Sequence, residues 1–452
     1  MTTVEAPPDH DVVEPDPFDS RMARNATGLL RTFNDAGILS AADVHLALRL
    51  GRLGPEDHEQ VLLAATFAAR APRLAHVCTD LATIGDTVTI DADLSVDVGA
   101  LPWPDTAEWL AAIRTSALVA VGVDGGDDRP LRLVGTRLYL DRYWREERQV
   151  AADLRARGGL LAPDVDIPLL AAGLTRLFAG PEPDYQRVAA ATAVLRNLTV
   201  VAGGPGTGKT TAVARVRALL HEQATAAGRR PPLVALAAPT GKAAARLEEA
   251  VHQEAAQLDI SHEARDWLLA LSASTLHRLL GWQPGNRARF RHNRRNHLPH
   301  GVVVVDETSM VPLTLMARLV EAVQLPSRLV LVGDPDQLAS VEAGAVLGDI
   351  VGPAADGLLL DPTARAAFAV VSGQEVPSSP PPAGAAVADG IVVLRHVHRF
   401  GGAIADLAEA VQQGDAQAAI AVLSGGHDDL LWLPVDVADA RGSDGLLNPV
   451  RQ

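Results

Sequence analysis

The sequence contains little cysteine, lysine or aromatic side chain, and it has no long apolar run. Cys78 is the only cysteine in 452 residues, which excludes an intramolecular disulfide framework and a cysteine-based zinc site, and we expect a buried core thiol there. Apolar stretches such as 302–305 are far shorter than the roughly 20 residues of a membrane helix. We therefore expect a cytoplasmic protein without a membrane span.

The charge balance limits the possible partners. The chain has 55 acidic residues against 40 lysines and arginines, for a net charge of −15, so it cannot coat nucleic acid indiscriminately, and any DNA contact must be a local basic groove. Arginine has replaced lysine except at Lys209 and Lys242, and both lysines stand in glycine-bearing turns after predicted strands. A compact ammonium group suits a phosphate cradle.

Periodicity and composition divide the chain into segments. We predict an acidic disordered lead-in (1–19), a helical N-terminal domain (20–125), a hairpin with a connecting helix (126–180), a nucleotide-binding α/β domain (181–352) with a basic insertion (283–300), a linker (353–390) and a fragment of a second such domain (391–452). In 126–180, Tyr139, Tyr143 and Trp144 could stack on bases, with core packing as the alternative.

The fold class follows from the segments between Gln186 and Asp349. The runs "LTVVA", "LVALAA", "VVVVD" and "RLVLVGD" are apolar throughout and alternate with helical patterns. Such strands are typical of a parallel sheet covered by helices on both faces. We predict an α/β, RecA-like P-loop NTPase core with a parallel sheet, preceded by a small helical domain.

A glycine-rich turn between a strand and a helix carries the most specific motif. Gly203-x-x-x-x-Gly208-Lys209-Thr210 matches the phosphate-binding loop of nucleoside triphosphatases. Backbone N–H groups hold the phosphates, Lys209 reaches the β- and γ-phosphates, and the Thr210 hydroxyl binds Mg²⁺. We expect ATP and Mg²⁺ as cofactors. The nucleotide-binding residues of the loop are Gly203, Gly204, Pro205, Gly206, Thr207, Gly208, Lys209, Thr210 and Thr211.

Two later strands end in side chains suited to hydrolysis. In "VVVVDETSM", Asp306 is placed to hold Mg²⁺ and Glu307 to polarise the attacking water. In "LVGDPDQL", Gln337 can sense the γ-phosphate unless it is a simple turn residue, while Asp334 and Asp336 are expected to cap the turn. The sequence therefore predicts hydrolysis and not binding alone.

Three further segments are candidate DNA contacts. "APTGKAAARL" and "STLHRLLG" provide polar helix starts, although an ordinary capped helix remains an alternative for the second. The stretch 286–300 has five arginines and three histidines, and it is either a DNA-backbone patch or a solvated loop; without a carboxylate or cysteine at ligand spacing we expect no zinc there. The candidates are Pro239, Thr240, Gly241, Lys242, Thr275, His277, Arg291, Arg294 and Arg295.

The order and spacing of these motifs resemble superfamily-one helicases, and most closely the RecD-type alpha subunits of exodeoxyribonuclease V. "DYQRVAAA" is similar to the family's adenine-contacting motif, which carries over to Gln186. "LRHVHRF" is similar to its fourth motif and carries over an arginine finger to Arg399, with a structural arginine as the alternative. "RLYLDRYWREE" and "RFGGAIADLAEAVQQGDAQAA" add to the resemblance, which covers about residues 20 to 425.

This resemblance implies an ATP-driven helicase moving 5′ to 3′ on single-stranded DNA. It implies bacterial double-strand-break repair together with RecB-like nuclease and RecC-like scaffold subunits, with the N-terminal domain docking on the scaffold and the protein associating with the nucleoid. It places the nuclease chemistry in another subunit. The family's later His-Lys-x-x-Gly and Thr-x-x-x-Arg motifs are absent, so we expect a truncated or frameshifted chain.

Two other functions stay open. Translocation needs two domains that close on ATP across a DNA strand, so the chain could instead be an ATP-binding regulatory or assembly subunit without autonomous unwinding. A stand-alone RecD-like helicase is a further alternative, although the helix-hairpin-helix glycines of that type are not found before residue 150. Stimulation of ATP hydrolysis by single-stranded DNA separates a motor from a binding module.

Overall fold

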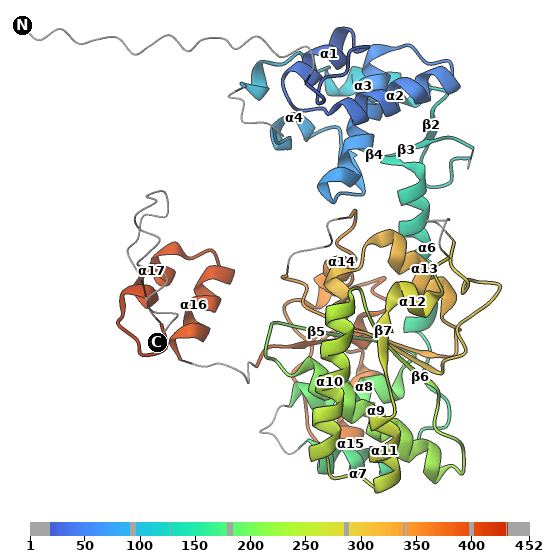
Figure 1. The fold of residues 1–452 in the computed structure, drawn as a ribbon, viewed down its shortest axis with the longest axis vertical. Coiled ribbons are helices and arrows are strands. Elements are labelled where there is room, and N and C mark those ends of the chain that lie inside the picture. The colour runs from blue at the N-terminus through green and yellow to red at the C-terminus, as the bar shows by residue number, and fades with distance from the viewer. Residues whose placement is uncertain are drawn as a thin grey trace, which may run out of the picture.

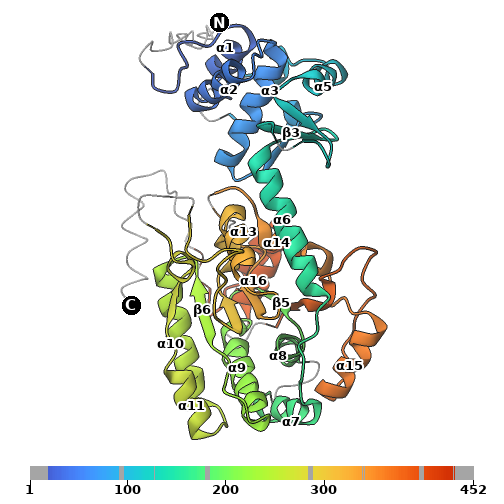
Figure 2. The same cartoon turned by 90° about the vertical axis from the view of Figure 1, so that its right-hand side faces the viewer.

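Two bodies joined by one long helix make up the described part of the chain (Figures 1 and 2). The structure, a computed structural model, describes residues 19–90, 96–126, 128–178, 184–283, 289–337, 340, 342–396, 402–430 and 432. Helix α6 (Asp141–Gly158) leaves the N-terminal body and packs along helix α13 (Leu313–Ala322) of the larger body. At its end, the Arg157 guanidinium donates to backbone carbonyls that follow α13, including that of Gln324 at 2.8 Å. These bonds attach the joining helix firmly to the larger body.

The N-terminal body has a helical core with aromatic residues at its centre. Its helices are α1 (Gly28–Asp35), α2 (Ala41–Leu53), α3 (Glu59–Arg70), α4 (Ile84–Thr87) and α5 (Thr106–Thr115). The buried rings of Phe33 and Phe67 meet edge to face with centroids 5.9 Å apart, and Trp109 lies 6.4 Å from Phe67. Ser40 begins α2 with a capping box completed by Asp43. This part of the predicted helical domain is confirmed.

The same body contains a sheet that the sequence analysis did not predict. Its strands, in the order β1-β4-β3-β2, are β1 (Cys78–Asp80), β4 (Arg137–Leu140), β3 (Leu131–Val134) and β2 (Val119–Val121). The hairpin around Gly135 therefore belongs to the N-terminal body, and the predicted boundary at 125/126 cuts through one sheet. Strands of three residues are too short to show a period of two, so the sequence pattern missed β1 and β2.

Two side chains of this sheet can be compared with the sequence analysis. Tyr139 is buried and its ring lies 5.2 Å from that of Trp144, which supports the packing alternative over base stacking. Cys78 is only partly buried, so the expectation of a core thiol is wrong. Burial still raises the pKa of its thiol.

The larger body is built on one parallel sheet of six strands in the order β10-β5-β9-β8-β6-β7. The strands are β5 (Leu198–Gly203), β6 (Val234–Ala238), β7 (Ala273–Thr275), β8 (Val302–Val305), β9 (Arg328–Gly333) and β10 (Ile391–Leu394). Each neighbouring pair runs parallel, with β5 registered against β9 from Leu198↔Leu329 onward. This architecture confirms the predicted α/β class with a parallel nucleotide-binding sheet.

Helices cover both faces of the sheet, which explains why its strands are apolar throughout. Val201 packs on one face and its neighbour Val200 on the other, as the strand period of two requires. The first face is covered by α7 (Ile167–Leu177), α8 (Tyr185–Leu195), α9 (Lys209–Ala226), α10 (Gly241–Gln257), α11 (His262–Leu269) and α15 (Pro362–Ser372). The second is covered by α6, α12 (Leu276–Leu280), α13 and α14 (Val346–Val351).

The structure corrects two predicted segments near the C-terminal end. The segment 353–390 is not a plain linker, because helix α15 lies within it and packs on α7 and α8. Asp361 caps that helix and Pro362 starts it, a helix signal that the proline-rich composition obscured. Strand β10, assigned by sequence to a second domain, pairs with β5 in the first sheet.

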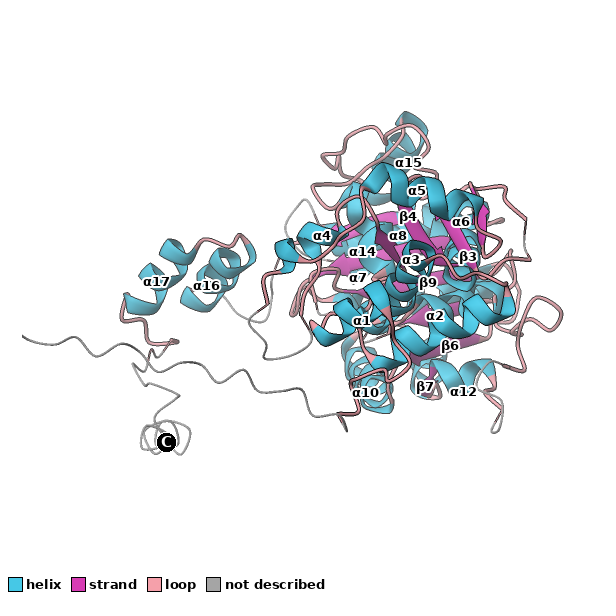
Figure 3. Ribbon diagram, turned by 90° about the horizontal axis from the view of Figure 1, so that it is seen from above, coloured by secondary structure: helices cyan, strands magenta, loops and turns pink. Residues whose placement is uncertain are grey.

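Helices α16 (Ala403–Gln412) and α17 (Ala416–Ser424) follow and pack against each other. Figures 1 and 3 show this pair beside the layered sheet and not within it. Within the residues that the structure describes, no helix is both long and apolar enough to cross a bilayer.

Candidate functional site

The glycine-rich loop joins β5 to α9 in a conformation that depends on glycine. Gly206 and Gly208 have φ of 79° and 82°, values that glycine adopts without the steric cost met by other residues. Gly208 is the N-cap of α9 and makes no side-chain cap, so the first N–H groups of the helix are left for a ligand. A Cβ at Gly203 would lie 2.5 Å from the Leu394 carbonyl oxygen on β10.

Lys209 is the cation of this loop. Its Nζ donates to the carbonyl oxygens of Gly203 and Gly204, the second at 2.9 Å. Burial lowers the pKa of the ammonium, and the negative charges of Asp334, Asp306 and Glu307 partly oppose that effect. Lys209 therefore lies within electrostatic reach of carboxylates from two other strands.

Asp306 and Glu307 follow β8 directly. Burial raises the pKa of Asp306 from its ordinary value of 3.8 to about 6, with the charge of Glu307 adding to the rise. The backbone N–H of Glu307 donates to Asp306 Oδ1 at 2.9 Å and Lys209 attracts the carboxylate, which both limit the rise. Glu307 has φ of 50°, a left-handed conformation that is strained for a residue with a Cβ and is often kept at functional sites.

Strand order explains how these groups meet. In the sheet, β9 lies between β5 and β8, so the ends of three adjacent strands carry the glycine loop, the 334–337 turn and the acidic pair. Ligands of open α/β sheets bind outside the carboxyl ends of the strands. The structure thus brings together the loop, Lys209, Asp306 and Glu307, as predicted from the sequence.

Gln337 and Asp334 occupy the turn after β9. The Asp336 N–H donates to Asp334 Oδ1 at 3.1 Å, which confirms the predicted turn cap for Asp334. Asp334 does more than the sequence analysis expected, because it is buried and its charge acts on Lys209. Gln337 is exposed and its side chain hydrogen-bonds Asp334, so it stands beside the site, and its predicted γ-phosphate contact stays a prediction.

Gln186 packs directly against the glycine loop from the first turn of α8. Its Nε2 donates to the Thr207 carbonyl at 3.0 Å, and a Cβ at Gly208 would lie 2.1 Å from the same nitrogen. Asp184 caps α8 and holds the helix start in place. A residue about twenty positions before Thr207 is therefore part of the loop's wall, while the adenine contact that the family resemblance implied for Gln186 stays a prediction.

Two groups of candidate DNA contacts lie at the starts of α10 and α12. These helices follow β6 and β7, which are adjacent strands of the sheet. The hydroxyl of Thr240 accepts from the Ala243 N–H at 3.2 Å, and that of Thr275 from the Arg278 N–H at 3.3 Å. Pro239, Gly241 and Lys242 belong to the same turn and first helical residues. Thr275 is thus an N-cap, as its alternative interpretation held.

A groove of about 540 Å³ lies between α10 and β7 beside these helix starts. Gly241, Thr275 and Arg278 contribute to its lining, so the two sequence segments share one surface. Glu248 and Glu249 also line it. The charge of Arg278 would attract a phosphate in this groove, and those of Glu248 and Glu249 would repel it.

The basic stretch is described from residue 289 onward and is partly neutralised. Arg294 donates to Asp153 of α6 at 2.7 Å. His277 packs against Phe290 with ring centroids 5.8 Å apart, and the Arg291 side chain lies against Gly281. Arg295 is exposed. Arg399, the proposed arginine finger, lies outside the described residues.

Comparisons with known proteins agree with this arrangement. A family model described as an AAA domain matches residues 186–343, and one described as the N-terminal domain of the RecBCD enzyme subunit RecD matches residues 35–139. The second match includes the β3–β4 hairpin, which agrees with its place in the N-terminal sheet.

Curated relatives match most of the chain. The RecBCD enzyme subunit RecD of Mycolicibacterium smegmatis is 48% identical over 412 residues, covering 90% of this chain and 64% of the relative. The chain is therefore similar to RecD subunits over nine tenths of its length. The same subunit of Mycobacterium tuberculosis (strain CDC 1551 / Oshkosh) is 49% identical over 411 residues, covering 91% and 62%.

A more distant relative is the ATP-dependent RecD2 DNA helicase of Deinococcus radiodurans, 33% identical over 249 residues, with 52% of this chain and 30% of the relative covered. The chain spans less than two thirds of the length of the mycobacterial relatives.

Proposed function

We propose that this chain binds ATP with Mg²⁺ at the edge formed by β5, β9 and β8 and hydrolyses it. One observation carries the proposal: the partly buried ammonium of the glycine loop, Lys209, is within electrostatic reach of Asp306, Glu307 and Asp334. A cation in a phosphate loop next to carboxylates from neighbouring strands is the arrangement that triphosphate hydrolysis requires.

The residues fit Mg²⁺ and ATP chemically. The uncapped start of α9 and the positive-φ glycines provide N–H groups for phosphate oxygens, and Lys209 can exchange its loop carbonyls for the β- and γ-phosphates. Thr210 and Asp306 would hold Mg²⁺, which when bound stabilises charge on the phosphate oxygens. Because burial disfavours the Asp306 anion, a nearby cation would favour its ionised form.

The other site residues have separate roles in the proposal. Glu307 accepts the proton of the attacking water, and Gln186 contacts the nucleotide base. Gln337 reports the state of the γ-phosphate through its bond to Asp334. Arg399 supplies an additional positive charge to the transferred phosphoryl group.

We further propose that hydrolysis drives movement on single-stranded DNA in the 5′-to-3′ direction, with DNA crossing the starts of α10 and α12. The names of the relatives place them in the RecBCD enzyme, and one relative outside it is a DNA helicase. By extension, the partners of this chain are RecB-like and RecC-like subunits and DNA ends, and the N-terminal body docks on the RecC-like scaffold. The setting is break repair in the bacterial cytoplasm at the nucleoid.

A regulatory ATP-binding subunit is the second candidate. The part of the chain that the structure describes contains one nucleotide-binding sheet, whereas translocation needs two domains that grip the strand in turn. In this case ATP hydrolysis would respond only weakly to DNA.

DNA-stimulated ATP hydrolysis tests both candidates. We expect single-stranded DNA to accelerate hydrolysis by the wild-type chain, and Lys209→Ala to reduce the basal and stimulated rates by about 100-fold or more, since several kcal/mol of phosphate binding is lost. Lys242→Ala should weaken the stimulation alone, and Arg230→Ala, at an exposed arginine, is the surface control. Full activity of Lys209→Ala would refute the nucleotide site, and a DNA-insensitive wild type would favour the regulatory subunit.

A further inference from the structure

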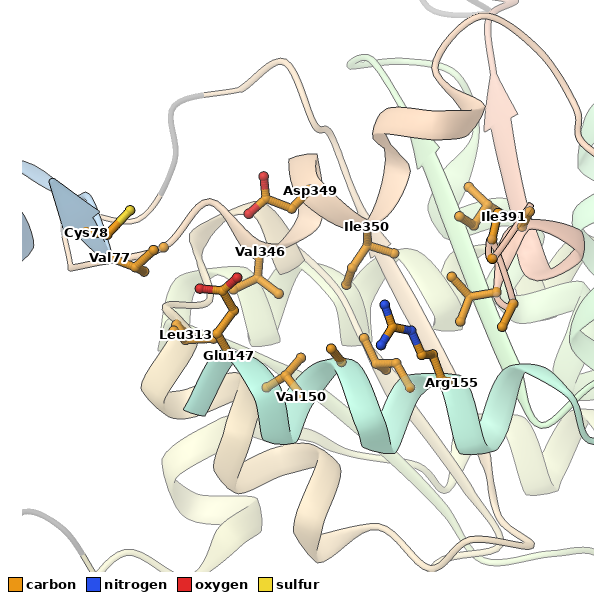
Figure 4. Close-up of a pocket in the computed structure, with 18 of the residues that line it drawn as sticks. Val77, Cys78, Glu147, Val150, Arg155, Leu313, Val346, Asp349, Ile350 and Ile391 are labelled. Carbon is orange, nitrogen blue, oxygen red and sulfur yellow. The ribbon is translucent and has the colours of Figure 1, made fainter. Parts of the chain in front are cut away.

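A cavity of about 480 Å³ lies where the two bodies meet (Figure 4). It is lined by Cys78 and Tyr139 of the N-terminal sheet, by one face of α6, by α14, and by Ile391 of β10. Its volume is within the range of small-molecule sites, and such sites are frequent at domain interfaces. None of its lining residues belongs to the nucleotide edge formed by β5, β9 and β8.

Helix α6 presents a patterned face to this cavity. Glu147, Val150, Ala151, Leu154 and Arg155 are spaced by three and four residues, and all of them line the cavity. Glu147 and Arg155 are eight residues apart, or roughly 12 Å along the helix axis. The floor therefore has an acidic end, an apolar middle and a basic end.

The acidic end holds two carboxylates from different elements. Figure 4 shows the Glu147 side chain of α6 and the Asp349 side chain of α14 at the end of the cavity near Cys78. Oε2 of Glu147 is buried and accepts no hydrogen bond from the residues that the structure describes. Burial raises the pKa of Glu147, the charge of Asp349 raises it further, and Arg137 opposes the rise; burial also raises the pKa of Asp349.

The arginines that line the cavity do not donate a hydrogen bond to Oε2 of Glu147 at the acidic end. Arg137 also lines the cavity, and its guanidinium lies 3.9 Å from Asp80. Arg155 points into the cavity at the other end (Figure 4). A buried acceptor without a donor costs about 1–3 kcal/mol, and a donor placed there by a ligand removes that cost.

We propose that this cavity binds a small aliphatic ammonium compound, with its ammonium group between Glu147 and Asp349 and its hydrocarbon chain over Val150, Leu154 and Ile350. The ammonium supplies the donor that Oε2 of Glu147 lacks and a positive charge for both carboxylates. The hydrocarbon chain covers the apolar floor of α6. A ligand in this position contacts α6, α14 and the N-terminal sheet together, so its binding stabilises the joint between the two bodies.

Three probes with the same six-carbon chain test the proposal by calorimetry on the full chain: n-hexylammonium, n-hexanol and hexanoate. We expect n-hexylammonium to bind at least tenfold more tightly than either of the others and to raise the unfolding temperature. The proposal is overturned if hexanoate binds as tightly, because the Arg155 end would then be the recognition group. Absence of n-hexylammonium binding at millimolar concentrations also overturns it.

Two variants locate the binding. The nearly isosteric double substitution Glu147→Gln/Asp349→Asn should weaken n-hexylammonium binding at least tenfold, while Glu375→Gln/Asp57→Asn, at exposed positions, should leave it unchanged. Ala151→Trp fills the cavity and should abolish binding of all three probes. If Ala151→Trp does not fold, the double substitution still decides: unchanged n-hexylammonium binding in that variant means that the ligand sits elsewhere.

Discussion

Two strand-turn-helix units of the same sheet differ at the point where the helix begins. Helix α9 starts after Gly208, which offers no side-chain cap, whereas α10 starts after Thr240, whose hydroxyl accepts from the Ala243 N–H. The first unit leaves its helix N–H groups for an external anion, and the second satisfies one of them internally. Equal topology therefore leaves N–H groups open for an anion in the first unit and allows at most a weaker phosphate contact in the second.

The charges around the two helix starts differ in the same sense. Lys209 is partly buried and lies within electrostatic reach of carboxylates that follow β8 and β9, which can share a metal ion with a phosphate. Lys242 is exposed, and the groove beside it contains Glu248 and Glu249 without a buried cation. Burial strengthens every charge interaction at the first unit, and water weakens those at the second.

The largest effect is expected at Asp306. Its folded pKa is raised from 3.8 to about 6, so the protonated carboxyl stabilises the fold below about pH 4, and that contribution is lost as the pH rises through 6. The difference corresponds to about 3 kcal/mol. Urea unfolding of wild type and Asp306→Asn from pH 4 to 7 measures it: the wild type should lose about that much stability relative to the variant.

The Asp306→Asn variant also tests the contrast between the starts of α9 and α10. Asp306→Asn should also lose most Mg²⁺-dependent hydrolysis, because an amide cannot provide the negative ligand. If the wild type and the variant show the same pH dependence of stability, the carboxyl is not desolvated at the nucleotide edge, and the contrast between the two units weakens.

A smaller effect is expected at Gly208. Gly208→Ala introduces a Cβ at φ 82° and 2.1 Å from Gln186 Nε2, so we expect a loss of about 1–3 kcal/mol in the free energy of unfolding and weaker ATP binding. Gly208→Ala/Gln186→Ala removes the clash but not the backbone strain, and should recover part of the stability. No recovery would show that Gln186 does not touch the loop. Thermal unfolding and nucleotide titration provide both values.

At the start of α10, the expected change in the free energy of unfolding is about 1 kcal/mol. Thr240→Ala removes the N-cap of α10 and should lower the unfolding free energy by that amount. Thr240→Ser keeps a capping hydroxyl and should retain the stability of the wild type. Basal ATP hydrolysis should stay unchanged and DNA stimulation should fall. If Thr240→Ala reduced basal hydrolysis as strongly as Lys209→Ala does, the two units would not be functionally distinct.

The smallest effect is expected at Arg294, in the basic stretch. Its ion pair with Asp153 is more than half exposed on the arginine side, so Arg294→Ala should change stability by less than about 1 kcal/mol. If the arginine also contacts DNA, the slope of binding against salt concentration should fall by about 1. A fluorescence anisotropy titration at several salt concentrations measures the slope, with Arg230→Ala as the control.

Much of the site could be predicted because its parts are local. A glycine loop between a strand and a helix has few possible conformations, and polar residues directly after an apolar strand must lie at the strand's carboxyl end. Lys209, Asp306 and Glu307 were therefore assigned correctly to one edge. The placement of Asp334 toward Lys209 was missed, since a local turn cap explained that residue fully.

The sequence by itself determined the periodic and strongly constrained features: the apolar strands, the phosphate loop and the helix starts, because short-range sterics and burial leave one solution for each. The tertiary structure alone decided that β10 joins the first sheet, that Asp153 neutralises Arg294, and that Glu147 faces Asp349 across a cavity. These features depend on which distant segments pack together. Such packing is the sum of many weak contacts, and no single stretch of sequence records it.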